Sequence, residues 1–302
     1  MDQVKDILQK IKEGDRKALS RAITLVENEL PGAEELLLTL SNDVRPPLIG
    51  ITGPPGAGKS TLINAMLNEL TDTGNKVAVI AVDPTSPFNF GSLLGDRLRM
   101  SEHFTDPNIF IRSLASRGSL GGLSEKIIEV SDVICSADFD FVIVETVGVG
   151  QSEVEIAGLA DITVVVVVPE SGDEIQALKS GIMEIADIFV VNKADREGAE
   201  ALVNNLKRML HDFRGTKMEV PVISTIASEK KGIRELLEII RENQYQVSDE
   251  KNIYLLAEKA YRIIRKNRMR DVSRPSLLKT IEKEHKSPGF SIYRLANQHL
   301  KE

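Results

Sequence analysis

The residues with the most definite chemistry form the run GPPGAGKS, which directly follows the apolar stretch PLIGIT. In its pattern, G-x-x-x-x-G-K-[ST], glycines let backbone N–H groups turn toward a phosphate, and the next helix adds its positive dipole end. Lys59 can bridge the β- and γ-phosphates, and the Ser60 hydroxyl can bind Mg²⁺. The helical pattern TLINAMLNEL comes next, so the run predicts a nucleotide phosphate site. Its residues are Gly53, Pro54, Pro55, Gly56, Ala57, Gly58, Lys59, Ser60 and Thr61.

A second motif, NKAD at 192–195, follows the apolar stretch IFVV. Asp195 can accept hydrogen bonds from N1–H and the exocyclic amine of guanine, and adenine would leave this carboxylate unpaired. Lys193 can lie against the base, and Asn192 can connect this loop to the phosphate loop. The stretch VISTIASEKKGI predicts a last base-contacting loop that includes Ser224, although Thr225 stands where GTPases often have alanine.

Three acidic residues are candidates for binding magnesium or the attacking water, and with Lys59 they form the predicted catalytic set. Asp83 ends the run KVAVIAVD, Asp96 lies in a stretch rich in glycine, proline and serine, and Glu145 ends FDFVIVE. A carboxylate at a strand end beside the phosphate loop can hold a metal-bound water, and the longer Glu side chain suits such an outer contact. The plainer alternatives are a turn acid for Asp83 and a helix acid paired with arginine for Asp96.

The stretch ETVGVGQSE begins at Glu145 and predicts a nucleotide-sensing loop. The N–H of Gly148 can meet the γ-phosphate, so the loop can respond to hydrolysis. No glutamine follows Gly148 directly, and Gln151 comes two residues later, so we assign Gln151 as a switch residue. We therefore expect slow intrinsic hydrolysis that rises when a partner or a second subunit orders the loops. Arg117, in the glycine loop RGSLGGL, can reach a phosphate or form a structural ion pair.

Composition excludes several classes of protein. The chain has 302 residues, 42% of them hydrophobic, and a net charge of −7, which gives no general attraction to nucleic acid or anionic membranes. Its single cysteine, Cys135, excludes a disulfide framework and Cys-based zinc sites within the chain. The charged N-terminus shows no signal peptide, and the longest apolar stretch, ITVVVVV, is too short to cross a bilayer. We expect a cytoplasmic protein that binds neither nucleic acid nor membrane.

These motifs need strands that bring them to one edge of a sheet. Seven short β-branched runs alternate with helical patterns, and their continuous apolarity predicts α/β structure with a mostly parallel central sheet, as in P-loop GTPases. We expect a helical N-terminal extension at 1–45, a P-loop GTPase domain at 46–245 and a helical C-terminal extension at 246–302. The basic residues between 259 and 274 form either a solvated helix face or a docking surface for an acidic partner.

Long strings of the chain, among them GDRKALSRAITLVEN, GSLLGDRLRM, ETVGVGQSE and ESGDEIQALKSGIMEIADIFVVNKAD, resemble the MeaB/ArgK family of accessory GTPases. The resemblance spans residues 14–196 almost continuously. It implies Mg²⁺-dependent turnover of GTP to GDP, with Lys59, Asp83, Asp96 and Glu145 at the nucleotide and metal. It also implies a third switch at 169–181, whose polar candidates are Glu170, Asp173, Gln176 and Lys179.

The same resemblance implies a chaperone that gates delivery of adenosylcobalamin to methylmalonyl-CoA mutase, or a close acyl-CoA mutase, and protects or reactivates it. Cobalamin adenosyltransferase is a further implied partner, and the implied assembly is a homodimer joined through the C-terminal helices. The alternative is a metallochaperone that inserts nickel or cobalt, but such GTPases need Cys or His ligands, and the four histidines show no ligand spacing. An ATP-driven transport component is a third reading, which NKAD disfavours.

Overall fold

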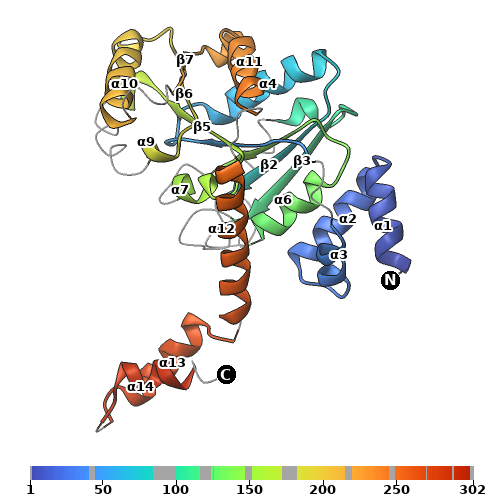
Figure 1. Ribbon diagram of the computed structural model, residues 1–302, viewed down its shortest axis with the longest axis vertical. Coiled ribbons are helices and arrows are strands. Elements are labelled where there is room, and N and C mark those ends of the chain that lie inside the picture. Colours follow the sequence, from blue (N-terminus) through green and yellow to red (C-terminus); the bar gives the residue numbers. More distant parts are fainter. Residues whose placement is uncertain are drawn as a thin grey trace. The chain divides into compact units, whose positions relative to one another are not determined.

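The computed structural model describes residues 2–40, 45–83, 100–115, 124, 126–146, 152–171, 182–214, 220–244, 249–269, 271–287 and 289–299. The chain divides into two compact units, Met1–Asn252 and Ile253–Glu302, and each is described by itself (Figure 1).

The first unit is built on a seven-stranded parallel sheet in the order β3-β2-β4-β1-β5-β6-β7 (Figure 1). Every residue of β1, β4, β5 and β6 is buried, because helices cover both faces of the sheet. This arrangement confirms the parallel α/β sheet that the continuous apolar runs predict. The strands are β1 (Leu48–Thr52), β2 (Val77–Asp83), β3 (Ile109–Ala115), β4 (Phe141–Glu145), β5 (Ile162–Val167), β6 (Ile188–Val191) and β7 (Val222–Ser224).

The strand order determines where a ligand can bind. β1 lies between β4 and β5, so the connections from β1 and β4 run to opposite sides of a crevice at the carboxyl edge of the sheet. The residue after β1 is Gly53, and the last residue of β4 is Glu145. The phosphate-loop motif and the ETVGVGQSE stretch therefore start side by side.

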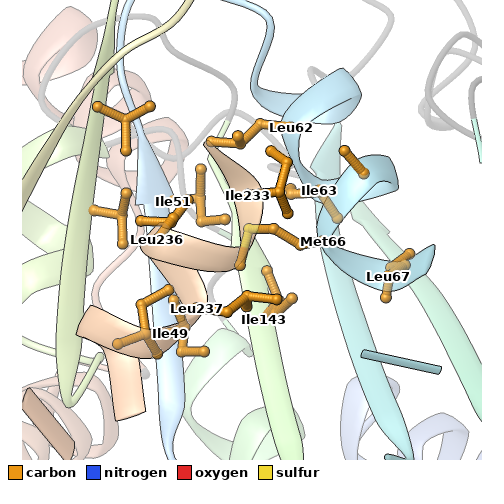
Figure 2. Close-up of a cluster of buried hydrophobic side chains, with 14 of the residues drawn as sticks. Ile49, Ile51, Leu62, Ile63, Met66, Leu67, Ile143, Ile233, Leu236 and Leu237 are labelled. Atoms are coloured by element: carbon orange, nitrogen blue, oxygen red, sulfur yellow. The ribbon is translucent and has the colours of Figure 1, made fainter. Parts of the chain in front are cut away.

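One face of the sheet is covered by α4 (Lys59–Asp72) and α11 (Ile233–Gln244). Figure 2 shows their apolar side chains over residues of β1 and β4. Leu62, Ile63 and Met66 of α4 and Leu236 of α11 are completely buried there. Burial of this size contributes about 1.5–3 kcal/mol per large side chain, so the helix that follows the phosphate loop is firmly held.

The opposite face carries two groups of helices. α1 (Asp2–Lys12), α2 (Arg16–Glu27), α3 (Ala33–Thr39), α6 (Ile127–Cys135) and α7 (Ser152–Ala157) are near β1 to β4, where their apolar residues share one core with Ile80 and Val144. α9 (Ile182–Ile185) and α10 (Ala199–Arg214) pack with Phe189 of β6 and its neighbours in a separate core. The three N-terminal helices are thus part of the main hydrophobic core.

Polar contacts also attach α2 to the sheet. Arg16 donates to the carbonyls of Pro107 and Ile109, and its guanidinium lies 6.0 Å from the centre of the Phe110 ring. At the other end of α2, Glu27 pairs with Arg112 of β3. Asp15 caps the helix by accepting from two backbone N–H groups, which lowers the pKa of its carboxyl.

The second unit starts within α12 (Asp249–Arg268) and continues through α13 (Arg274–Glu284) and α14 (Ile292–Gln298). Ser273 caps α13 by accepting from the N–H of Ser276. Many of its large apolar side chains are exposed: Ile253, Tyr254, Leu256, Tyr261, Ile264, Leu278, Ile292 and Tyr293. Within the described part of the chain, no helix is both long and apolar enough to cross a lipid bilayer.

Candidate functional site

The phosphate-loop motif occupies the turn between β1 and α4, as its sequence predicts. Its glycines are required by close contacts: a Cβ on Gly53 would lie 2.0 Å from the carbonyl oxygen of Val166. A Cβ on Gly58 would lie 2.4 Å from Nδ2 of Asn192, and Gly58 has a φ of +88°, which favours glycine. The loop backbone is therefore pressed against β5 and against the NKAD motif.

Lys59 is the first residue of α4 and is buried. Its Nζ donates to the carbonyl oxygens of Gly53 at 2.9 Å and Pro54 at 3.1 Å. The ammonium group is thus held against the loop backbone instead of reaching into solvent. A cation fixed beside glycine-rich backbone can neutralise phosphate oxygens. Thr61 is exposed in the first turn of the same helix.

Ser60 and Glu145 are brought together from positions 85 residues apart. The Ser60 hydroxyl donates to Oε1 of Glu145 at 2.7 Å, and both residues are buried. Glu145 is positioned by the pairing of β4 with β1, which sets it beside Ile51. A hydroxyl and a carboxylate at the end of a phosphate loop are the oxygen ligands that Mg²⁺ uses, directly or through water, so these residues fit the metal.

Asn192 connects the phosphate loop to the base-reading loops. It is buried, and its Nδ2 donates to the carbonyl oxygen of Ala57 at 2.9 Å. Its Oδ1 accepts from the Thr225 hydroxyl at 3.1 Å and from the Ala227 N–H at 3.2 Å. One amide thus joins three segments that are distant in the sequence, as the NKAD motif suggested for two of them.

The NKAD turn directly follows β6, and its last residue is exposed to solvent. Lys193 donates to the carbonyl oxygen of Gly56 at 2.8 Å and has a φ of +54°, an uncommon conformation for a residue with a side chain. Asp195 is exposed, and the preceding Ala194 donates its N–H to the carbonyl of Thr225 at 3.0 Å. Ser224, the end of β7, is also exposed. The carboxylate that is predicted to read guanine is therefore accessible.

For the other predicted residues, the structure describes fewer contacts or none. Asp83 is the last residue of β2, which pairs with β4 beside the phosphate loop, as a strand-end acid should. Glu170 lies in the short 3-10 helix η2 (Pro169–Ser171) after β5 and pairs with Arg196. The remaining predictions fall outside the described residues: Asp96, Arg117, Gly148, Gln151, Asp173, Gln176 and Lys179.

Three residues at the site escape the sequence motifs. Thr225 is buried and contacts Asn192, Val191 and Ala194 through hydrogen bonds, although it departs from the usual alanine. Arg196 and Lys231 lie near the NKAD carboxylate and form ion pairs with other acids. The sequence signal for Arg196 is its position directly after Asp195, and that for Lys231 is its place in the stretch VISTIASEKKGI, which predicts a base-contacting loop without singling out this lysine.

The nickel or cobalt alternative would require a cluster of ligands. Among the residues that the structure describes, no three His, Cys, Asp or Glu side chains lie together in a way that could hold a metal ion. Cys135 is buried in the apolar core of α6, and His103, in the 3-10 helix η1 (Ser101–His103), is buried beside Glu102.

Comparisons with known proteins agree with this geometry. The model of the family described as "Methylmalonyl Co-A mutase-associated GTPase MeaB" matches residues 19–284. A protein of Pyrococcus abyssi that is named as a GTPase is 48% identical over 248 residues, covering 80% of this chain and 76% of the relative. GTPase ArgK of Escherichia coli is 38% identical, with 76% of this chain and 72% of the relative covered.

Two further matches extend the comparison. The mouse protein named methylmalonic aciduria type A homolog, mitochondrial, is 37% identical over 78% of this chain and 61% of its own. The crystal structure of an LAO/AO transport system kinase superposes with a TM-score of 0.69 at 28% identity, covering 95% of this chain and 94% of the other. Together with the phosphate loop and the NKAD turn, these matches show that the chain is a P-loop GTPase of the MeaB family, the methylmalonyl-CoA mutase-associated GTPases.

Proposed function

We propose that this GTPase is a chaperone that gates delivery of adenosylcobalamin to methylmalonyl-CoA mutase, or to a close acyl-CoA mutase, and protects or reactivates that enzyme. The observation that carries the proposal is the match of residues 19–284 to the family of methylmalonyl-CoA mutase-associated GTPases. Within the molecule, the part of the proposal that concerns nucleotide sensing is supported by the buried hydrogen bond between Ser60 and Glu145. It links the phosphate loop to the start of the ETVGVGQSE segment, so a change at the phosphates would move the same segment that we expect to report nucleotide state.

In this proposal each predicted nucleotide and metal residue has a definite task. The backbone of Gly53 to Gly58 and the ammonium of Lys59 bind the phosphates, Ser60 and Glu145 hold Mg²⁺, and Asp195 reads guanine. Bound Mg²⁺ would supply charge neutralisation at the β- and γ-phosphates. Asp83 and Asp96 complete the proposed metal set, and Gly148 contacts the γ-phosphate.

We expect slow turnover without a partner. A glutamine directly after Gly148 would orient the attacking water, and here Val149 occupies that position. Partner contact would then have to order the loops before hydrolysis becomes fast. We assign Gln151, Glu170, Asp173, Gln176 and Lys179 to that communication, with the mutase as the main partner and cobalamin adenosyltransferase as a further one.

We also infer a homodimer joined through the C-terminal helical extension at 246–302. The support from this molecule is the set of large exposed side chains in the second unit, which includes Tyr293 at 83% and Ile253 at 67% exposure. A soluble chain gains by covering such residues with a second copy. Sedimentation analysis tests this: a monomer at micromolar concentration would contradict it.

The chaperone proposal is tested by binding the purified GTPase to the organism's cobalamin-dependent mutases in the presence of GDP or a non-hydrolysable GTP analogue. We expect binding to one mutase, with an affinity that differs between the two nucleotides. Lys59→Ala serves as the matched control, because it should bind the mutase without nucleotide discrimination. Absence of binding, or binding that ignores the nucleotide in the unaltered protein, would remove the proposal.

A further inference from the structure

The carboxylate of Asp195 has two cationic neighbours. Arg196 follows it directly in the chain, and Lys231 lies in the loop after β7, which contacts the NKAD turn through the hydrogen bond from Ala194 to Thr225. The pKa of Arg196 is raised mainly by its hydrogen bond with Glu170 and that of Lys231 mainly by its hydrogen bond with Glu229, and the negative charge of Asp195 adds to both shifts. An exposed carboxylate near two cations would ordinarily attract them, and an ion pair with either cation would compete with guanine.

Each cation, however, is held by a different carboxylate. Arg196 donates through Nη1 to Oε1 of Glu170, and this hydrogen bond is the largest cause that lowers the pKa of Glu170. Lys231 pairs with Glu229 at 2.7 Å. Within the described residues, Asp195 itself forms no ion pair. The positive charges are thus engaged beside the base-reading carboxylate and not on it.

The backbone places Glu170 beside Arg196 and Glu229 beside Lys231. Glu170 lies just after β5, and Arg196 lies just after the neighbouring β6, with Val167 and Val191 in register. A Cβ on Gly198 would lie 4.0 Å from Cβ of Pro169, at the outer limit of van der Waals contact, so the two loops are neighbours. Glu229 lies in the 3-10 helix η4 (Ala227–Glu229), two residues before Lys231, and Ile226 and Lys231 bridge this turn through their backbones.

We propose that Glu170 and Glu229 are positioning residues for guanine recognition, because they hold Arg196 and Lys231 away from Asp195 and leave its carboxylate available to the base. The inference rests on the proposed role of Asp195 in reading guanine. It gives Glu170 a task at the nucleotide in addition to the partner role assigned above. The acids do not touch the base; they remove two competing cations.

The inference predicts an asymmetric pattern that an ordinary stabilising ion pair would not give. Glu170→Gln frees Arg196, so the affinity for GDP should fall about three- to fivefold, the range of an exposed ion pair. Arg196→Gln removes the competitor, so GDP should bind within about twofold of the unaltered protein. The double variant Glu170→Gln/Arg196→Gln should recover that affinity. Glu229→Gln, Lys231→Gln and their double variant should repeat the pattern.

The measurement is equilibrium binding of a fluorescent GDP analogue, with inosine diphosphate as a second ligand. Inosine lacks the 2-amino group, so it makes one hydrogen bond fewer to Asp195 and should lose less affinity than GDP in Glu170→Gln. Higher ionic strength should narrow the difference between Glu170→Gln and the unaltered protein, since salt screens an exposed pair. Circular dichroism of each variant confirms that it is folded.

Equal losses in Glu170→Gln and Arg196→Gln would overturn the inference, because they would mean that the pair only supports the turn. Unchanged affinity in Glu170→Gln and in Glu229→Gln would overturn it as well. Asp195→Asn separates this failure from failure of the proposed site. If GDP binding ignores that substitution, Asp195 does not read guanine; if binding falls while both Glu variants bind normally, only the positioning role is wrong.

Discussion

The two halves of the nucleotide site are built in opposite ways. The phosphate half consists of buried groups that bond to backbone or to each other, as Lys59 does with Gly53 and Ser60 with Glu145. The base half exposes its central carboxylate, Asp195, and surrounds it with ion pairs that are themselves exposed. The phosphate half is held in place by burial, and the base half depends on a balance of surface charges.

This difference teaches where the site can be adjusted. Buried hydrogen-bonded groups lose much when one partner is removed, because the other is left without compensation in a low-dielectric interior. Exposed ion pairs are weak and respond to salt. Phosphate binding should therefore change little with salt concentration. The affinity for the base should change slightly when salt or a substitution alters the exposed charges.

The largest effect should come from the phosphate half. Lys59→Ala removes the cation that we place on the phosphates, and GTP hydrolysis should fall about 10²- to 10³-fold, as when one charge-stabilising group is removed elsewhere. Phosphate release at saturating GTP and Mg²⁺ measures it. Lys207→Ala, an exposed lysine on α10, is the matched control and should keep the full rate. If Lys59→Ala hydrolyses GTP at a rate near that of Lys207→Ala, the phosphate half of the site does not depend on its buried cation.

The next effect should be a change of base specificity. Asp195→Asn loses a charged acceptor for N1–H and the amine of guanine, and GDP should bind about 10- to 100-fold more weakly. The new amide can donate to the 2-oxo group of xanthine, so xanthosine diphosphate should bind more tightly than to the unaltered protein. Competition binding measures both, and Asp212→Asn, exposed on α10, serves as control. Parallel losses for both nucleotides would show that Asp195 acts only on the structure of the turn.

A smaller effect is expected at the residue that joins the halves. Asn192→Ala leaves the hydroxyl of Thr225 and the N–H of Ala227 without their acceptor, so the free energy of unfolding should fall by about 1–3 kcal/mol. Urea unfolding checks this value, with Asn204→Ala, exposed on α10, as the control that should stay near the unaltered stability. A stability loss equal to that of the control would mean that the halves do not depend on Asn192.

The smallest effect is a pH dependence outside the site. His103 is buried, and burial lowers the pKa of its imidazole, while Glu102 and Asp106 partly oppose the shift and Lys230 adds to it. The folded state therefore binds the proton less well than the unfolded state, and stability should decline as pH falls below about 6.5. Unfolding measured from pH 7.5 to 5.5 should show a shallower decline for His103→Asn.

The exposed His211→Asn is the control for that experiment and should keep the slope of the unaltered protein. The neighbouring Glu102 accepts a hydrogen bond from Asn64 of α4, and the positive charge of Lys230 further lowers the pKa of His103. If the slope of stability against pH is the same in His103→Asn as in the unaltered protein, the buried imidazole does not cause the loss of stability at low pH.

Much of the fold could be predicted from the sequence, because strands buried on both faces leave continuous apolar runs. The phosphate loop and the NKAD turn were also predictable, since each is a short motif whose chemistry fixes its spacing. The motif also suggested that Asn192 connects the two loops. The sequence placed Ser60 and Glu145 near the same metal, but their direct hydrogen bond was not predicted and comes from the structure.

The charge arrangement around Asp195 could not be predicted in the same way. Glu170 and Arg196 are 26 residues apart, and their contact depends on the register of β5 and β6, for which the sequence gives no periodic signal. Thr225 was read as a departure from a motif, whereas its buried hydroxyl serves Asn192. Polar contacts between residues far apart in the sequence depend on how the strands are ordered and paired, whereas a motif describes only residues that are close in the sequence.

The attachment of the N-terminal helices has a consequence for how the molecule could be shortened. Ile11, Ala22 and Ile23 are almost completely buried, in the same cluster as Ile80 and Val144 of the sheet. In a chain that began at residue 46, α6 and α7 would still cover part of this sheet face, but the apolar side chains that now pack against α1, α2 and α3 would be exposed to water, and such patches favour aggregation. The first three helices thus cover apolar surface of the GTPase domain that α6 and α7 alone leave open.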